Sequence, residues 1–151
     1  MKTKSVIIIG ISAIAIGLLL VVGYLISPGS YPDSERYNIN KSQMILLSKI
    51  DSFKSHDNRY NIPALANVYD SLSRSYHVYI YNYNRNQIIH LVVQQEDKNQ
   101  STLRFTGINQ GLKLGNWKMI NKDFNDTENE AILSDFEKNI LRQLGIVYKR
   151  E

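Results

Sequence analysis

Two histidines and four tyrosines lie close together in residues 76–93, which read YHVYIYNYNRNQIIHLVV. An imidazole can move protons at neutral pH, and two imidazoles on one surface could also bind a zinc ion. In two paired strands, His77 and His90 would share one face at a diagonal distance of about 7 Å. A zinc site needs at least a third ligand, which this pattern does not supply. We therefore predict hydrogen-bonded strand histidines, with no metal and no cofactor.

The aromatic side chains of the same stretch are suited to recognition. Tyr79, Tyr81 and Tyr83 recur at every second residue, and Trp117 could lie beside them. Tyrosine is a good strand former that covers a half-exposed sheet, which is one interpretation of this row. Tyrosine and tryptophan are also frequent anchors at protein interfaces, which is the other interpretation. The candidate recognition surface comprises His77, Tyr79, Tyr81, Tyr83, His90 and Trp117.

Motifs for catalysis are missing from the sequence. It contains no cysteine, which excludes thiol catalysis, and no G-x-S-x-G, H-E-x-x-H, P-loop or dinucleotide-binding pattern. We therefore predict a non-catalytic protein. The alternative is a small hydrolase that uses His77 or His90 with an acid from a loop, which would require a deep pocket joining an imidazole to a carboxylate.

The charge balance does not indicate a nucleic-acid partner. The formal net charge is +4, from 18 Lys and Arg against 14 Asp and Glu. Two of the basic residues, Lys2 and Lys4, precede an apolar N-terminal segment, so the remainder has 16 basic residues against 14 acidic ones. Basic residues dominate 98–122 and acidic residues dominate 123–137, which predicts two solvated faces that complement each other. Nucleic-acid binding needs clustered, unopposed Lys and Arg, so we expect none.

A β-hairpin is the element that would position the histidines and tyrosines. Residues 76–83 and 87–94 are rich in tyrosine and β-branched residues, and Asn84, Arg85 and Asn86 separate them. A loop with an even number of residues, centred between Asn84 and Arg85, would give the hairpin one face directed at the core. This face would hold Tyr76, Val78, Ile80, Ile89, Leu91 and Val93. The opposite face would then hold His77, Tyr79, Tyr81, Tyr83, Ile88, His90 and Val92. A loop of odd length would exchange these neighbours.

The rest of the chain predicts two helices and one or two further strands. A helix is expected over residues 41–54, with Asn40 as its cap, a contact between Ile39 and Met44, and an apolar face of Leu46, Leu47, Ile50 and Phe53. Residues 64–75 stay open between a short helix and irregular structure. Strands are expected over residues 101–109 and around residues 112–120.

A second helix is expected to begin at a capping box of Thr127 and Glu130 and to end at Gly145. Its apolar stripe would be Leu133, Phe136, Ile140 and Leu144. The predicted fold class is α+β: an N-terminal transmembrane helix, then an antiparallel meander of three or four strands with two helices on one face, in the order α-β-β-β-(β)-α.

The N-terminal segment is the longest apolar run. Residues 5–26 carry no charge and would rise about 33 Å as a helix, against a hydrocarbon core of about 30 Å. Because basic residues precede it and acidic residues follow it, we predict a signal anchor, with residues 1–4 cytoplasmic, a linker over 27–38 and an exported domain over 39–151. A cleaved signal peptide is the alternative. Gly10, Ala13 and Gly17 would allow a weak homodimer through this helix.

The segment LGNWKMINKDFNDTENEAILSDFEKNIL, residues 114–141, resembles the C-terminal part of small, uncharacterised envelope proteins of Bacteroidetes-type bacteria. The resemblance implies a bacterial envelope location, periplasmic or extracellular, but no activity, and no functional residue can be transferred from it. Together with the aromatic row, it predicts a membrane-anchored envelope protein whose exported domain binds a protein or cell-envelope partner in an accessory or immunity-like role. A scaffold that acts through its transmembrane helix is a further alternative.

Overall fold

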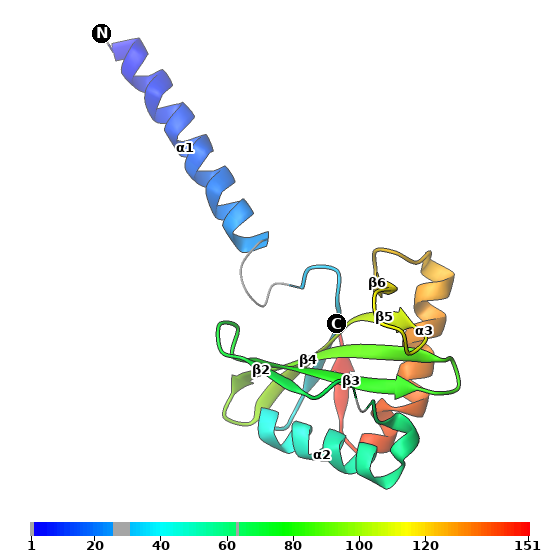
Figure 1. The fold of residues 1–151 in the computed structure, drawn as a ribbon. Helices are drawn as coiled ribbons and strands as arrows, with labels where there is room; N and C mark the ends of the chain where they lie inside the picture. Colours follow the sequence, from blue (N-terminus) through cyan, green and yellow to red (C-terminus); the bar gives the residue numbers. More distant parts are fainter. Residues whose placement is uncertain (1, 26–30, 63) are drawn as a thin grey trace. The chain divides into compact units, whose positions relative to one another are not determined.

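The computed structural model describes residues 2–25, 31–62 and 64–151, with side-chain exposure over residues 12–23, 31–62 and 64–151 (Figure 1). The chain divides into two compact units, Met1–Pro32 and Asp33–Glu151. The second unit contains every strand of the described residues and two of the three α-helices, so it carries the candidate site.

The first unit holds the helix α1 (Lys2–Leu25). No helix of the described residues is sufficiently long and apolar to cross a membrane, which contradicts the predicted transmembrane helix over residues 5–26. Of the predicted helix-packing face, Ala13 and Gly17 are exposed, whereas Gly10 lies among the residues whose side chains are not described.

The second unit is built on one antiparallel sheet of seven strands: β1 (Glu35–Ile39), β2 (Val68–Asp70), β3 (Ser75–Asn82), β4 (Gln87–Asp97), β5 (Gln100–Gln110), β6 (Trp117–Met119) and β7 (Tyr148–Arg150). The strand order is β2-β3-β4-β5-β1-β7, and β6 pairs with β5. The α+β class and the antiparallel sheet are as predicted, but the predicted number of three or four strands is wrong. The additional strands are the short β1, β2 and β7, whose three to five residues give too little periodicity to be recognised.

The central hairpin has the register predicted for an even loop. Asn82 pairs with Gln87, so four residues form the turn, and Tyr79 pairs with His90 and Ile80 with Ile89. Val78, Ile80, Ile89, Leu91 and Val93 are at most 2% exposed, as expected for the core face. The opposite face carries His77, Tyr79, Tyr81, Ile88, His90 and Val92.

The strand β5 is long enough to be shared by two partners along one edge. Its first half pairs with β1, from Ser101 opposite Ile39 to Phe105 opposite Glu35, and its second half pairs with β6. A bulge at Thr106 separates the two halves. Beyond it, a Cβ on Gly107 would lie 2.5 Å from the carbonyl oxygen of Lys118, so glycine is what allows β6 to approach. The strand β1 begins within the predicted linker over 27–38.

The helix α2 (Gln43–His56) has the predicted apolar face but a different cap. Its N-cap is Ser42, which makes no side-chain cap bond, instead of Asn40. The backbone N–H of Gln43 donates to Oε1 of Gln95 on β4 (2.7 Å), and the buried side chain of Gln43 donates to the Val93 carbonyl (2.9 Å). Met44, for which we predicted a contact with Ile39, is 65% exposed, whereas Ile39 is 1% exposed.

The helix α3 (Asp126–Asn139) begins two residues earlier than its predicted capping box. Asn125 and Glu128 form the box, with the side chain of each accepting from the backbone N–H of the other. The predicted stripe of Leu133, Phe136, Ile140 and Leu144 is buried, but it extends past the end of α3 into the 3-10 helix η2 (Leu141–Leu144). Gly145, with φ +60, closes η2 instead of α3. Of residues 64–75, Val68–Asp70 form β2, 71–74 form a turn and Ser75 begins β3, and the 3-10 helix η1 (Asn58–Tyr60) precedes them.

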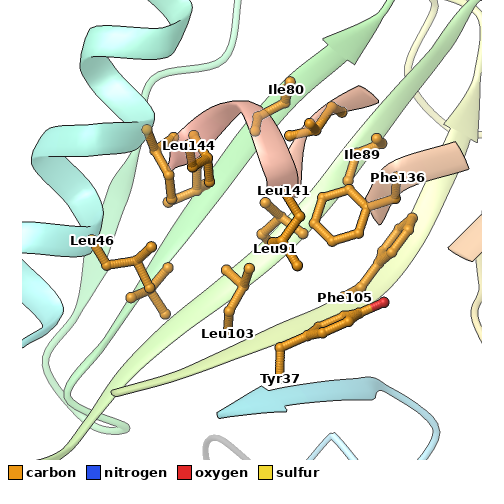
Figure 2. Packing of buried hydrophobic residues seen from close by; sticks show 14 of the residues in the cluster. Tyr37, Leu46, Ile80, Ile89, Leu91, Leu103, Phe105, Phe136, Leu141 and Leu144 are labelled. Atoms are coloured by element: carbon orange, nitrogen blue, oxygen red, sulfur yellow. The ribbon is translucent and has the colours of Figure 1, made fainter. Parts of the chain in front are cut away.

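One hydrophobic core lies between the sheet and both helices, on the same face of the sheet (Figure 2). Phe136 of α3 packs against Phe105 of β5 and Tyr37 of β1, with ring centroids 4.8 and 5.8 Å away. Leu46 of α2 and Leu144 of η2 close the other end of this layer. The helices therefore leave the opposite face of the sheet to its own side chains.

The C-terminal strand β7 is attached to α3 and β1 by an ionic cluster around Arg150. The guanidinium pairs with the buried carboxylate of Glu35, with both oxygens of Glu130 (2.7 and 2.8 Å) and with Glu137 at 3.6 Å. The hydroxyl of Tyr37 donates to Glu137 over 3.2 Å. This cluster occupies the side of the sheet that carries the core.

Candidate functional site

The outer face of the sheet, which the two helices do not cover, holds most of the predicted recognition residues. His77 and Tyr79 project from β3, and His90 projects from β4 opposite Tyr79. Ile88 and Val92 lie on the same face and are 0% exposed. Because α2 and α3 both pack on the opposite face, the larger side chains of the outer face must cover Ile88 and Val92.

Four of these side chains form an aromatic cluster, which comprises His77, Tyr79, His90 and Trp117. The His90 ring stacks between His77 and Tyr79, with centroids 5.1 and 4.9 Å away. Trp117, on β6, lies edge-on to His90 at 5.8 Å and 6.2 Å from Tyr79. The close approach of β6 at Gly107 is what brings the indole across to the histidines.

A chain of hydrogen bonds orders the two histidines. The hydroxyl of Thr106 donates to the His90 carbonyl (3.0 Å), so its oxygen accepts from Nδ1–H of His90 over 2.7 Å. With Nδ1 protonated, the neutral His90 ring accepts at Nε2 from Nδ1–H of His77 over 2.9 Å. Hydrogen bonds of this kind were predicted for the strand histidines. They occupy Nδ1 of His77 and both ring nitrogens of His90.

Burial, with a smaller contribution from the nearby His77, lowers the pKa of His90 from 6.5 to about 4. A proton on Nε2 of His90 would also bring two N–H groups face to face, because Nδ1–H of His77 already donates to that nitrogen. The His90 imidazole is therefore neutral at physiological pH. Its ring acts as a polar core residue and not as a proton carrier.

Acidification should destabilise the second unit through His90. The unfolded state binds this proton below about pH 6.5 and the folded state only near pH 4, so the contribution to stability is complete above 6.5 and is lost as the pH falls. We expect the free energy of unfolding to fall by roughly 2–3 kcal/mol between pH 7 and pH 4. Denaturant titrations between pH 7 and 5, where carboxylates stay ionised, would measure the slope.

The controls for this experiment are two histidine variants. His90→Gln should abolish most of the slope although it lowers stability at pH 7, and His56→Gln, on the exposed end of α2, should keep the wild-type slope. An unchanged slope in His90→Gln would contradict the assignment.

The described cavities do not bring His77 or His90 together with a carboxylate, as the alternative hydrolase would require. The described cavities are lined by other residues: one of about 440 Å³ lies beside Arg36 and Lys149, and the remaining ones border α2 and α3. None of these cavities is lined by His77 or His90. Within the described residues, no group of three or more His, Asp or Glu could hold a metal ion.

The structure separates the remaining two tyrosines. The hydroxyl of Tyr81 donates to Oδ1 of Asn86 in the hairpin turn (2.6 Å), at the edge of the aromatic cluster. Tyr83 lies in that turn and packs instead against the core, where its ring contacts Tyr60 (5.2 Å) and the Arg59 guanidinium (4.2 Å). Tyr83 is therefore not part of the outer face, since the strand alternation ends at Asn82.

A loop beside the aromatic cluster exposes two leucines that sequence reasoning missed. We call residues 111–116 the leucine loop; it connects β5 to β6 and leads directly into Trp117. Leu112 is 58% exposed, Leu114 47% and Trp117 38%. The signal in the sequence was GLKLGNW, in which apolar residues lie between two glycines, but this stretch was predicted to belong to a strand around residues 112–120, of which only Trp117–Met119 forms.

Asn109, which is 0% exposed, holds the leucine loop in a fixed conformation. Its Nδ2 donates to the carbonyls of Gly111 (2.8 Å) and Lys113 (2.9 Å), and its Oδ1 accepts from the N–H groups of Gly115 and Asn116 (3.1 and 2.8 Å). The N–H of Gly111 donates to the Asn86 carbonyl (2.8 Å), which ties the loop to the hairpin turn. The loop therefore has a defined shape without a partner.

Comparisons with protein-family models, with curated proteins and with solved structures found no match. The resemblance of residues 114–141 to Bacteroidetes envelope proteins stays a prediction. Contacts, exposure and charge within the second unit are the basis of the functional assignment.

Proposed function

We propose that this protein is a non-catalytic binding protein that recognises a protein or cell-envelope partner through the leucine loop and the adjoining aromatic cluster. The observation that carries the proposal is the rigid loop that exposes Leu112 and Leu114 next to Trp117. A group of exposed aliphatic and aromatic side chains on one ordered loop is typical of recognition surfaces.

Preorganisation strengthens this argument. Binding normally loses about 0.5–1.5 kcal/mol for each flexible side chain that it immobilises, and a prefolded loop avoids most of the corresponding backbone term. The stacked rings of His77, His90 and Tyr79 likewise give the surface beside the loop a fixed conformation. Lys113 is exposed in the loop between the two leucines, and no described ion pair includes it, which favours an acidic partner surface.

A photoreactive residue placed at position 113 of the full chain should form covalent adducts with the native partner when it is irradiated in the cells that naturally produce this protein. The control position is Leu72, which is 80% exposed in the turn between β2 and β3, away from the leucine loop. We expect discrete adducts from position 113 and none of the same mass from position 72.

Two variants test whether the loop is responsible. Leu112→Ser combined with Leu114→Ser should remove at least nine-tenths of the adduct without changing the melting temperature by more than about 2 °C, since both side chains are exposed. Asn109→Ala should also reduce the adduct, because both leucines remain but the loop loses its hydrogen bonds. Equal adducts in all three proteins would refute the proposed function.

A further inference from the structure

A cavity lies at the end of the sheet where β4 and β1 finish and β5 and β7 begin, so it is at the opposite end of β5 from the leucine loop. Its volume is about 440 Å³, which is within the range of small-molecule sites. Residues from these four neighbouring strands and their ends line it. Among the lining residues are Arg36, Asn38, Glu96, Gln100, Val147 and Lys149.

Two basic side chains lie together on one side of this cavity. Lys149 of β7 pairs directly with Asn38 of β1, and Arg36 is two residues before Asn38 on the same face of the sheet. The Cβ atoms of Lys149 and Arg36 are therefore diagonal neighbours, about 7–8 Å apart. Lys149 is exposed, and no described ion pair includes it. Its ammonium group is available to an anionic group in the cavity.

Glu96 supplies a carboxylate of which one oxygen is in use. Its Oε1 accepts from the Thr102 hydroxyl (2.5 Å) and lies 3.5 Å from Nη2 of Arg36. Its Oε2 makes no hydrogen bond among the described residues, and the side chain is 41% exposed. An ionic hydrogen bond is usually 2.7–2.9 Å long, so the pair with Arg36 is a loose one. This carboxylate can accept from a cationic group in the cavity.

The available charges of opposite sign are on different strands. Thr102, which holds Glu96, and Lys149 pair with Asn38 from its two sides, so about 10 Å separates their backbones. Arg36 is shared between Glu96 and Glu151, whose Oε2 lies 3.2 Å from Nε. The two basic and two acidic side chains therefore balance. A ligand with one charge would leave either Lys149 or Glu96 without a partner, whereas a ligand with both charges would match both.

The rest of the lining suits a peptide. The side-chain amide of Gln100 makes no hydrogen bond among the described residues, and it can both donate to and accept from a peptide group. Val147 is 77% exposed beside the cavity and offers an apolar surface for a small side chain.

We propose that this cavity binds a short zwitterionic peptide of about two residues, with its terminal carboxylate at Lys149 and its terminal ammonium at Glu96. One apolar side chain of the peptide packs against Val147, and Gln100 bonds to the peptide group. An extended dipeptide spans about 7 Å, and a hydrogen bond of about 3 Å at each end lets it reach both charges.

The free termini are the feature that the site recognises. An internal segment of a protein chain carries neither terminal charge, and a simple anion carries only one of the two. The inference does not rest on the proposed function, because it uses other residues at the other end of β5.

The test compares free dialanine with N-acetyl-dialanine and dialanine amide on the full chain, with the Val147 methyl signals in NMR spectra as the readout. We expect free dialanine to bind with a dissociation constant of about 1 mM or lower, the affinity that ligands of this size reach. Both blocked peptides should bind at least tenfold more weakly, because each lacks one terminal charge.

Two variants assign each end of the peptide. Lys149→Gln should weaken binding of free dialanine about tenfold and leave dialanine amide unchanged, since the amide has no carboxylate. Glu96→Gln should weaken free dialanine similarly and leave N-acetyl-dialanine unchanged. Lys138→Gln is the matched control, because Lys138 is exposed on α3, is in no described ion pair and does not line the cavity. It should bind free dialanine as the unmodified protein does.

Three results would overturn the inference. The first is a lack of any Val147 shift with free dialanine at about 20 mM, well above the expected dissociation constant. The second is equal binding of the free and the blocked peptides, and the third is equal weakening by Lys149→Gln and Lys138→Gln. The protein with Leu112→Ser and Leu114→Ser should bind free dialanine normally, so failure of the leucine loop as a recognition site would be seen separately.

Discussion

Replacing Phe136 with alanine should lower the free energy of unfolding by about 3–5 kcal/mol, the range for removing a buried phenyl ring from a well-packed core. The ring is 1% exposed and touches both Phe105 of β5 and Tyr37 of β1. It is therefore the contact through which α3 is held to the centre of the sheet. Chemical denaturation followed by circular dichroism would measure the loss.

Phe124 provides the matched control. It is only partly buried at the edge of the core, where the Lys118 ammonium lies 5.4 Å from the ring centre. Phe124→Ala should cost about 1 kcal/mol, since part of its surface is already in water. If both variants lost the same free energy, Phe136 would not have the central position that the structure gives it.

Replacing Arg150 with methionine should destabilise the unit by about 3 kcal/mol. The change leaves the carboxylate of Glu35, which is 9% exposed, without its cation, and it also removes both bonds to Glu130. Removing one partner of a buried ion pair leaves an uncompensated charge, which costs about 3–5 kcal/mol, and the 32% exposure of Arg150 reduces this value. Thermal unfolding of the variant at low and moderate salt would test it.

Lys122→Met is the control for this cluster, because Lys122 is 61% exposed and lies 3.9 Å from Asp33. Its loss should be below about 0.5 kcal/mol. Adding Glu35→Gln to Arg150→Met should recover part of the stability, since the second change removes the charge that the first left unpaired. Failure to recover would contradict a direct pairing of the two residues.

Periodic segments were predictable from the sequence because their pattern extends over many residues. The hairpin register followed from an even turn centred between Asn84 and Arg85, and the buried stripe of α3 and η2 followed from helical spacing. The ends of elements were less predictable, because several residues can serve as caps. A glutamine from β4 supplies the bond at the start of α2, and no local pattern contains that information.

Short strands escaped prediction for a related reason. The strands β2 and β7 have three residues each and are defined by their neighbours in the sheet instead of by their own composition. The transmembrane helix over residues 5–26, predicted from its uncharged length and flanking charges, is contradicted, because no helix of the described residues is sufficiently long and apolar to cross a membrane.

The candidate site was predictable in part. Alternation along β3 and β4 placed His77, Tyr79 and His90 on one face, and Trp117 was a possible neighbour that the structure brings to 5.8 Å from His90. Asn109 could not be identified, because an asparagine that organises a loop looks like any other of the many in this chain. Tyr83 was grouped with the wrong surface because the turn interrupts the alternation.

Trp117 is the single tryptophan of the chain, and its indole meets His90 edge-on at the margin of the leucine loop. All indole emission of the protein therefore originates at one place. A partner that covers this ring should shift the emission to shorter wavelengths, and a proton reaching the neighbouring imidazole should quench it. Fluorescence of the unlabelled protein can thus follow occupancy and acidification at this position in solution.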